Sequence, residues 1–178
     1  MKYVALLRGI NVGGNTLIKM ADLKAAVKKA GFTNVMTYIA SGNLLFETKE
    51  TGAAAIEKTL EQVIHQTFHL PVRVVVLNDK QYKKVLDDVP ESWKTRGDIR
   101  CYIAFLKRPT TAAQVMKEVQ PKEGIDVITP GTGAVYMATL LSGLTKSGIN
   151  KIIGKKIYQD MTMRNYNTSK KLLELLEK

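Results

Sequence analysis

Four short, mostly apolar runs occur in the first half of the chain, and these runs predict four strands. The predicted strands are 2–8, 35–40, 44–47 and 72–77. Between them, apolar residues recur at helical spacing in two longer segments, 20–30 and 53–68. The resulting order, β-α-β-β-α-β, is the ferredoxin-like plan, with right-handed crossovers and strand order 4-1-3-2.

The second half of the chain partly repeats this pattern. It predicts, in order, a helix over 80–89, a strand over 99–106, a helix over 112–119, two strands over 125–129 and 134–139, a short helix near 149–153 and a terminal helix over 169–177. We therefore predict an α+β fold of two similar ferredoxin-like subdomains packed together. The first spans residues 1–78, and the second spans 79–178 and includes the terminal helix.

A glycine-rich segment follows the first predicted strand. It runs from Arg8 to Asn15 and contains Gly9, Gly13 and Gly14. A strand, a glycine-rich loop and a helix are typical of anion binding, because backbone N–H groups and the helix N-terminus create a positive concavity. The segment matches a Walker A motif except that Asn15 replaces the phosphate-binding lysine. The next helix begins too late and no Walker B aspartate ends a hydrophobic strand, so a nucleoside triphosphatase is disfavoured.

The predicted topology places three connections at one end of the first sheet, namely 8–19, 41–43 and 69–71. The first and third strands are neighbours about 4.8 Å apart, so Arg8 is expected to lie beside Asn43. Side chains of this kind suit a phosphate or a carboxylate. The predicted ligand-binding residues at this end are Arg8, Gly9, Asn11, Gly13, Gly14, Asn15, Ser41, Gly42 and Asn43. Turn chemistry alone is an alternative explanation for Gly42 and Asn43, and a need for positive φ is one for the loop glycines. Arg8 could instead cap the end of the sheet or pair with a carboxylate, and Asn11 could make an Asx-type bond to the backbone.

A second polar cluster precedes the terminal helix, in the most basic part of the chain. The net charge is +11, and residues 146–178 contain eight Lys and Arg against three Asp and Glu. Arg164, Asn165 and Asn167 are predicted ligand-binding residues, and Tyr166 is placed to stack on a base. Asn167 or Thr168 is also a good helix N-cap. The lysines that would attract phosphate, or simply form a solvated helix face, are Lys146, Lys151, Lys155, Lys156, Lys170 and Lys171.

The remaining composition gives little support for catalysis or metal binding. His65 and His69 are the only histidines, and no glutamate follows His65 as the zinc-protease pattern requires. We predict no catalytic residue, no metal and no cofactor. The single cysteine, Cys101, favours a reducing cytoplasm. No apolar stretch approaches the roughly 18–20 residues of a membrane helix, and the N-terminus lacks signal-peptide features.

Three sequence blocks together resemble a known family. They are ALLRGINVGG at 5–14, TYIASGN at 37–43 and TMRNYNT at 162–168. In this order and spacing they closely resemble the bacterial domain-of-unknown-function family numbered 1697. The resemblance covers essentially the whole chain and implies a cytoplasmic bacterial protein with two similar α+β subdomains. It implies no reaction and supplies no catalytic residues. Tyr166 departs from the family pattern, in which tryptophan is common, but it keeps an aromatic ring there.

The leading hypothesis from the sequence is a non-catalytic or regulatory module that binds a phosphate-bearing ligand, namely RNA, DNA or a nucleotide. A second hypothesis is an enzyme acting on a small anionic substrate, with Arg8 and the loop amides as electrostatic stabilisers. It ranks lower because no general base is evident. A third hypothesis is a protein-interaction domain that uses an exposed sheet face or edge.

Overall fold

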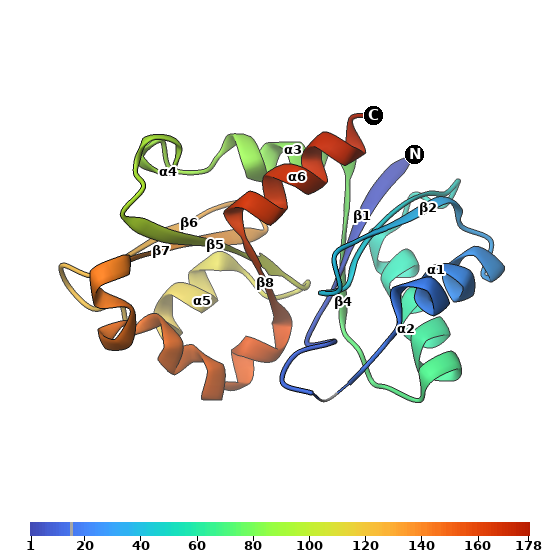
Figure 1. The fold of residues 1–178 in the computed structure, drawn as a ribbon, viewed down its shortest axis with the longest axis horizontal. Coiled ribbons are helices and arrows are strands. Elements are labelled where there is room, and N and C mark those ends of the chain that lie inside the picture. Colours follow the sequence, from blue (N-terminus) through green and yellow to red (C-terminus); the bar gives the residue numbers. More distant parts are fainter. Residues whose placement is uncertain (15) are drawn as a thin grey trace. The chain divides into compact units, whose positions relative to one another are not determined.

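The computed structural model, which describes residues 1–14 and 16–178, shows an α+β fold with two four-stranded antiparallel sheets (Figure 1). Helices pack against each sheet, so the two halves are similar subdomains, as predicted. The chain divides into two compact units, Met1–Lys83 with Lys171–Lys178, and Lys84–Lys170. The division falls inside two helices, whereas the sequence analysis places a single boundary between 78 and 79.

The first unit has the predicted strand order. Its elements are β1 (Lys2–Leu7), α1 (Met20–Lys29), β2 (Thr33–Tyr38), β3 (Asn43–Glu47), α2 (Ala53–Phe68) and β4 (Val74–Asn78). The sheet order is β2-β3-β1-β4, which is 4-1-3-2 read from the other edge. Both helices lie on the same face of this sheet (Figure 1). Helix α2 has the predicted bounds because Ile56, Leu60 and Ile64 recur every four residues and are buried.

The second unit repeats this sheet with a different set of helices. Its elements begin with the end of α3 (Asp79–Asp87) and continue with α4 (Ser92–Thr95), β5 (Ile99–Leu106), α5 (Ala112–Glu118), β6 (Asp126–Pro130) and β7 (Ala134–Leu140). Three short 3-10 helices follow, η1 (Leu141–Lys146), η2 (Ile149–Gly154) and η3 (Lys156–Asp160), and then β8 (Met161–Asn165) and α6 (Tyr166–Leu176). The sheet order is β6-β7-β5-β8, so β5 and β8 correspond to β1 and β4. The 3-10 helices stand where the first unit has α2 in chain order.

The segment before the terminal helix differs from the sequence prediction. Residues 161–165 form strand β8, paired antiparallel with β5, whereas the sequence analysis treats them as a polar lead into the helix. Helix α6 begins at Tyr166, and the Asn165 Oδ1 accepts a hydrogen bond from the N–H of Asn167 (2.9 Å). The cap is therefore Asn165, and the predicted cap at Asn167 or Thr168 is wrong. The strand was missed because its apolar residues are two methionines separated by threonine, a weak strand signal.

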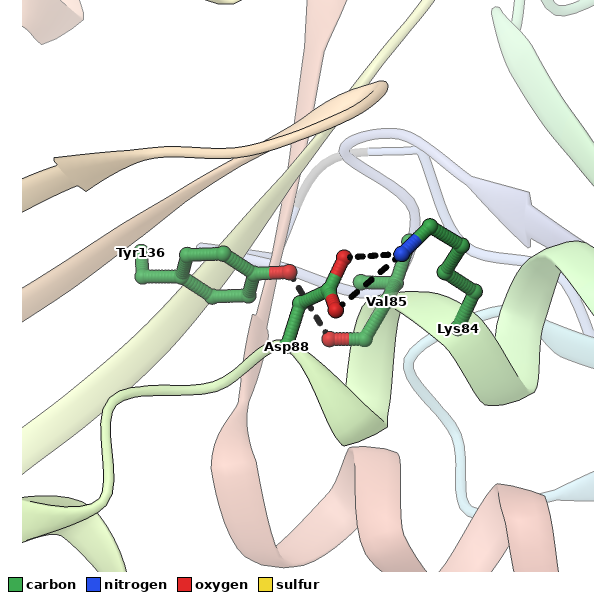
Figure 2. Close-up of polar contacts among 4 residues, drawn as sticks. All are labelled: Lys84, Val85, Asp88 and Tyr136. Carbon is green, nitrogen blue, oxygen red and sulfur yellow. Dashed lines mark hydrogen bonds and ion pairs between the residues drawn. The ribbon is translucent and has the colours of Figure 1, made fainter.

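A buried tyrosine joins the sheet of the second unit to the end of α3. The Tyr136 hydroxyl donates to the Val85 carbonyl at 2.8 Å, next to the Lys84–Asp88 ion pair (Figure 2). Trp93, the single tryptophan, packs edge-on against the same ring at 5.9 Å between centroids. Burial, with a smaller contribution from the charge of Asp88, raises the pKa of Tyr136 to about 12.

Tyr136→Phe is expected to lower the free energy of unfolding of the second unit by about 1–2 kcal/mol, because the buried Val85 carbonyl loses its donor. The difference should shrink in alkali. The unfolded tyrosine loses its proton near pH 10, whereas the native one keeps it to about pH 12. The stabilisation by Tyr136 is therefore full below pH 10 and is lost as the pH rises through that window. Denaturant unfolding followed by Trp93 fluorescence, for both proteins across this pH range, measures the effect. A difference that stays constant with pH would contradict this explanation.

Candidate functional site

Three connections of the first unit meet at one end of its sheet, and we call this end the rim. The N–H of Leu7 donates to the carbonyl of Gly42 (2.8 Å), and the N–H of Arg8 donates to the carbonyl of Arg73 (2.9 Å). The loop 8–19, the β2–β3 hairpin turn and the connection from α2 to β4 therefore lie together. The predicted neighbourhood of these three connections is confirmed.

The side chain of Asn11 connects the loop 8–19 to the β2–β3 hairpin by hydrogen bonds. Its Nδ2 donates to the carbonyls of Ile18 (2.9 Å) and Ala40 (2.7 Å), and its Oδ1 accepts from the N–H of Ile18 (2.8 Å). Its φ is +55°, a conformation that asparagine tolerates better than most residues. Because the amide is engaged on both sides within the protein, Asn11 shapes the loop.

The hairpin residues at the rim also bond to one another. Asn43 is fully buried, and its Nδ2 donates to the Tyr38 carbonyl (3.0 Å) and to the Ser41 Oγ (3.0 Å). These two hydrogen bonds join residues on both sides of the turn and stabilise it. Asn43 is paired with Leu6 of β1, so the turn lies at the end of β1 that leads into Arg8.

The second unit shows which features of the rim belong to the shared fold. There the N–H of Leu106 donates to the carbonyl of Gly133 (3.0 Å), just as Leu7 donates to Gly42. The φ of Gly133 is +71° and that of Gly42 is +75°. This repetition supports the turn-chemistry explanation for Gly42.

Unlike the turn at Gly42, the loop 8–19 has a length that the shared fold does not require. It joins β1 to α1 with twelve residues, whereas 107–111 joins β5 to α5 with five. The short connection ends in a capping box in which the Thr111 side chain accepts from the third helical residue. The additional residues of the longer loop therefore need another explanation.

The loop glycines present exposed backbone. Gly9, Gly13 and Gly14 have φ of +69°, +65° and +78°, and apart from their chain neighbours no described residue has an atom within 4 Å of where a Cβ would stand. The conformation explains why glycine occurs there. The open space means that a ligand can approach the backbone closely. Asn15, which was also predicted to bind a ligand, lies outside the described residues.

The rim carries a positive charge at one position where the second unit has an acidic residue. Arg8 is half-buried, and Lys19 and Arg73 are exposed. In the second unit the N–H of Lys107 donates to the carbonyl of Asp160 (2.8 Å), so an acidic residue stands where the rim has Arg73. Arg73 is a rim residue beyond those predicted from the sequence, although the predicted strand order already puts the start of β4 next to the end of β1.

The second predicted cluster is mostly part of the fold of the second unit. Arg164 is only 8% exposed, and its Nη1 donates to the Met163 carbonyl (2.9 Å). Asn165 caps α6, and Asn167 is exposed in its first turn. Tyr166 is half-buried, with its ring edge-on to Trp93 at 5.4 Å. This packing gives the aromatic ring a role in the fold.

Three of the six lysines that were predicted to attract phosphate contact other side chains. The contacts are Lys155–Glu118 (3.0 Å), Lys171–Glu174 (2.8 Å) and Lys170 over the ring of Tyr166 (4.7 Å to the centroid). Lys146, Lys151 and Lys156 are exposed and form no ion pair with any residue that the structure describes. The alternative explanation, a solvated charged surface, therefore fits at least half of the set.

Residues 1–14 and 16–178 contain neither a cluster of metal-ligating side chains nor a helix that could cross a membrane. Within these ranges, no three His, Cys, Asp or Glu side chains gather closely enough to hold a metal ion. None of the helices in the same ranges has the length and apolar character that a bilayer span requires.

Comparison with known proteins adds a family. The family described as "Protein of unknown function (DUF1697)" matches residues 1–136. The chain belongs to this family. The fold of this DUF1697 protein is also similar to that of the conserved bacterial protein SP0830 from Streptococcus pneumoniae, with a TM-score of 0.85, 24% identity and 98% coverage of both chains. No curated protein matches the chain. Because these names carry no activity, the chemistry of the DUF1697 rim has to come from its own residues.

Proposed function

We propose that the rim binds a phosphate-bearing ligand, RNA, DNA or a nucleotide, without catalysing a reaction on it. The observation that carries the proposal is the comparison between the two units. The same strand-to-helix connection needs five residues in the second unit, yet the rim uses twelve and includes three exposed glycines at positive φ. A length that the fold does not require, at a site of positive charge, favours a ligand site.

The chemistry of the rim suits an anion. Arg8, Lys19 and Arg73 provide positive charge, and the exposed backbone of Gly13 and Gly14 allows close approach. Asn11 fixes the shape of the loop before any ligand arrives, which lowers the ordering cost of binding. Arg8, Lys19 and Arg73 carry cationic side chains and no carboxylate, so these three residues are suited to holding an anion and not to removing a proton from it.

A cytoplasmic location is part of the same proposal. Cys101 is buried, and its burial raises the pKa of the thiol to about 11. The side chain is therefore a neutral, inert thiol at neutral pH, which is consistent with a reducing compartment.

Removing charge from the rim is expected to weaken the binding of single-stranded RNA roughly tenfold for Arg8→Gln and somewhat less for Lys19→Gln. Each change should also reduce the steepness of log affinity against log salt by about 0.7 for single-stranded RNA, because one phosphate contact is lost. Fluorescence anisotropy with labelled RNA, a DNA duplex of equal length and labelled ATP measures both effects and ranks the three ligands.

Lys29→Gln is the matched control. Lys29 is exposed and lies at the far end of α1, the helix that begins directly after Lys19. Lys29→Gln changes the net charge by the same amount as Lys19→Gln but leaves the rim intact. Equal losses for Lys19→Gln and Lys29→Gln, or binding that does not depend on salt, would refute a phosphate site at the rim.

A second candidate function, protein interaction, is favoured by the apolar residues of the same surface. Val12 and Leu17 of the loop are 65% and 71% exposed, and Ile39 of the hairpin is 49% exposed. Large apolar side chains grouped on one surface often mark a contact with a partner protein. If none of the three phosphate ligands binds, this function takes precedence.

A further inference from the structure

A pocket of about 340 Å³ lies in the second unit, between its sheet and the 3-10 helices. Arg100 and Tyr102 reach it from β5, Met137 and Thr139 from β7, and Met163 from β8. These residues share one face of the sheet, because Arg100 pairs with Thr139 and Tyr102 pairs with Met137 across the strands. The opposite wall comes from η1, η2 and η3.

The pocket exists because the second unit has no counterpart of α2. In the first unit, this long helix places Ile56, Leu60 and Ile64 against its sheet. In the second unit, three short 3-10 helices follow β7 and leave part of the sheet uncovered. The volume of the space falls at the lower end of the range for small-molecule sites.

Three polar side chains of the lining, Arg100, Tyr102 and Asn150, have no hydrogen-bond or ion-pair partner among the described residues. Arg100 and Asn150 are exposed at the mouth, and Tyr102 is half-buried. In the part of the chain that the structure describes, no hydrogen bond or ion pair joins any of these side chains to another residue. They offer a guanidinium, a carboxamide and a phenol as donors.

The rest of the lining is apolar or already satisfied. Its apolar residues are Met137, Leu144, Ile149, Ile152, Ile153 and Met163. Arg100 is the only charged residue among the twelve that line the pocket. One positive charge beside a largely apolar wall matches a ligand with a single negative charge and an apolar body.

The wall opposite Arg100 is held in place by Asp126, outside the lining. Its carboxylate accepts hydrogen bonds of 2.8 Å from the hydroxyls of Thr139 and Ser147 and from the N–H of Gly148. Thr139 and Ser147 line the pocket, so these bonds tie the 3-10 segment to the sheet. In the part of the chain that the structure describes, no ion pair joins Asp126 to Arg100.

We propose that this pocket binds a small carboxylic acid with an apolar body. The carboxylate pairs with the guanidinium of Arg100 and accepts further hydrogen bonds from Tyr102 and Asn150. The apolar body contacts the isoleucines and methionines, whose flexible thioether side chains adapt to its shape. The site lies wholly within the second unit and involves no residue of the rim, so it stands or falls independently of phosphate binding there.

The test compares acids with their uncharged amides. Phenylacetate, hexanoate, phenylacetamide and hexanamide are each titrated into the protein. Calorimetry measures the affinity of each compound, and NMR shifts of residues in β5 and η2 locate the bound compound. At least one acid is expected to bind roughly tenfold more tightly than its amide, because only the acid forms a charge-assisted pair with arginine. Phenyl phosphate is included as a dianion and is expected to bind less well than phenylacetate.

Two arginine variants locate the charge. Arg100→Gln is expected to reduce the affinity for the acid roughly tenfold and to leave that for the amide unchanged. Arg108→Gln removes the same charge from an exposed residue of the same unit outside the pocket, and it should change neither affinity. Leu144→Trp, which fills the pocket, should abolish binding of both compounds.

Three results would overturn the proposal. The first is that neither acid binds, and the second is that acid and amide bind alike. The third is that Arg100→Gln and Arg108→Gln have equal effects. Tighter binding of phenyl phosphate than of phenylacetate would overturn the assignment of a single negative charge.

Discussion

Replacing Asp126 by alanine is expected to lower the free energy of unfolding of the second unit by about 3–5 kcal/mol. The side chain is 8% exposed and accepts four hydrogen bonds of 2.8 Å, from Lys122 N–H, Thr139 Oγ1, Ser147 Oγ and Gly148 N–H. Alanine leaves all four donors without this acceptor. The effects of the four bonds are not additive, because the donors share one acceptor group, so the loss stays below their sum.

Denaturant unfolding followed by the fluorescence of Trp93 measures this loss within the same unit. Asp88→Ala is the control, because Asp88 is an exposed carboxylate whose ion pair with Lys84 (2.9 Å) lies in solvent. Exposed pairs of this kind contribute little to stability. Similar losses for the two variants would contradict the role given to Asp126.

The same carboxylate makes the second unit sensitive to acid. Burial acts to raise the pKa of Asp126, but the hydrogen bonds from Lys122, Ser147, Thr139 and Gly148 together hold it below the ordinary value of 3.8. The unfolded chain therefore takes up this proton at a higher pH than the native protein does. The stabilisation is full above pH 3.8 and is lost as the pH falls through the lower native pKa. Asp126→Asn should flatten that part of the curve of stability against pH.

The elements with a clear apolar period could be predicted from the sequence. Helix α2 and strand β5 have the predicted bounds, since α2 buries an apolar residue every four positions and β5 is an apolar run whose last four residues are all buried. The 3-10 helices and β8 could not be predicted as such. Their positions depend on contacts with the sheet, such as the bonds of Asp126 to Ser147 and Gly148, and not on a local period.

The location of the rim could also be predicted, because strand order and chain direction determine which connections share an end. The hydrogen-bond partners of each side chain at the rim could not be predicted. Asn11 and Asn43 carry amides suited to a ligand, yet both donate to carbonyls of the protein itself. Whether these amides bond to the protein or stay open to a ligand depends on the path of the loop 8–19, and the residue spacing in the sequence does not determine that path.

Gly42→Ala is expected to destabilise the first unit by about 2–4 kcal/mol, the second largest effect that we predict. The φ of Gly42 is +75°, and a Cβ there would stand 2.8 Å from the Cβ of Leu7 and 2.7 Å from the Cδ1 of Ile10. Ile10 can turn its side chain, but the Cβ of Leu7 is attached to the backbone of β1, which lies between β3 and β4. The backbone must therefore shift where Leu7 donates to the Gly42 carbonyl (2.8 Å).

Gly13→Ala separates the strain of positive φ from the steric contact with Leu7. Gly13 has a φ of +65°, and apart from its chain neighbours no described atom lies within 4 Å of its Cβ position. It carries the strain of positive φ alone, about 1–2 kcal/mol. Circular dichroism during denaturant unfolding measures both losses, and equal losses would show that the contact with Leu7 is unimportant. Because Gly42 joins the hairpin to the end of β1, Gly42→Ala should also displace the rim. If the rim is the phosphate site, the folded fraction of this variant should bind RNA more weakly than the wild-type protein.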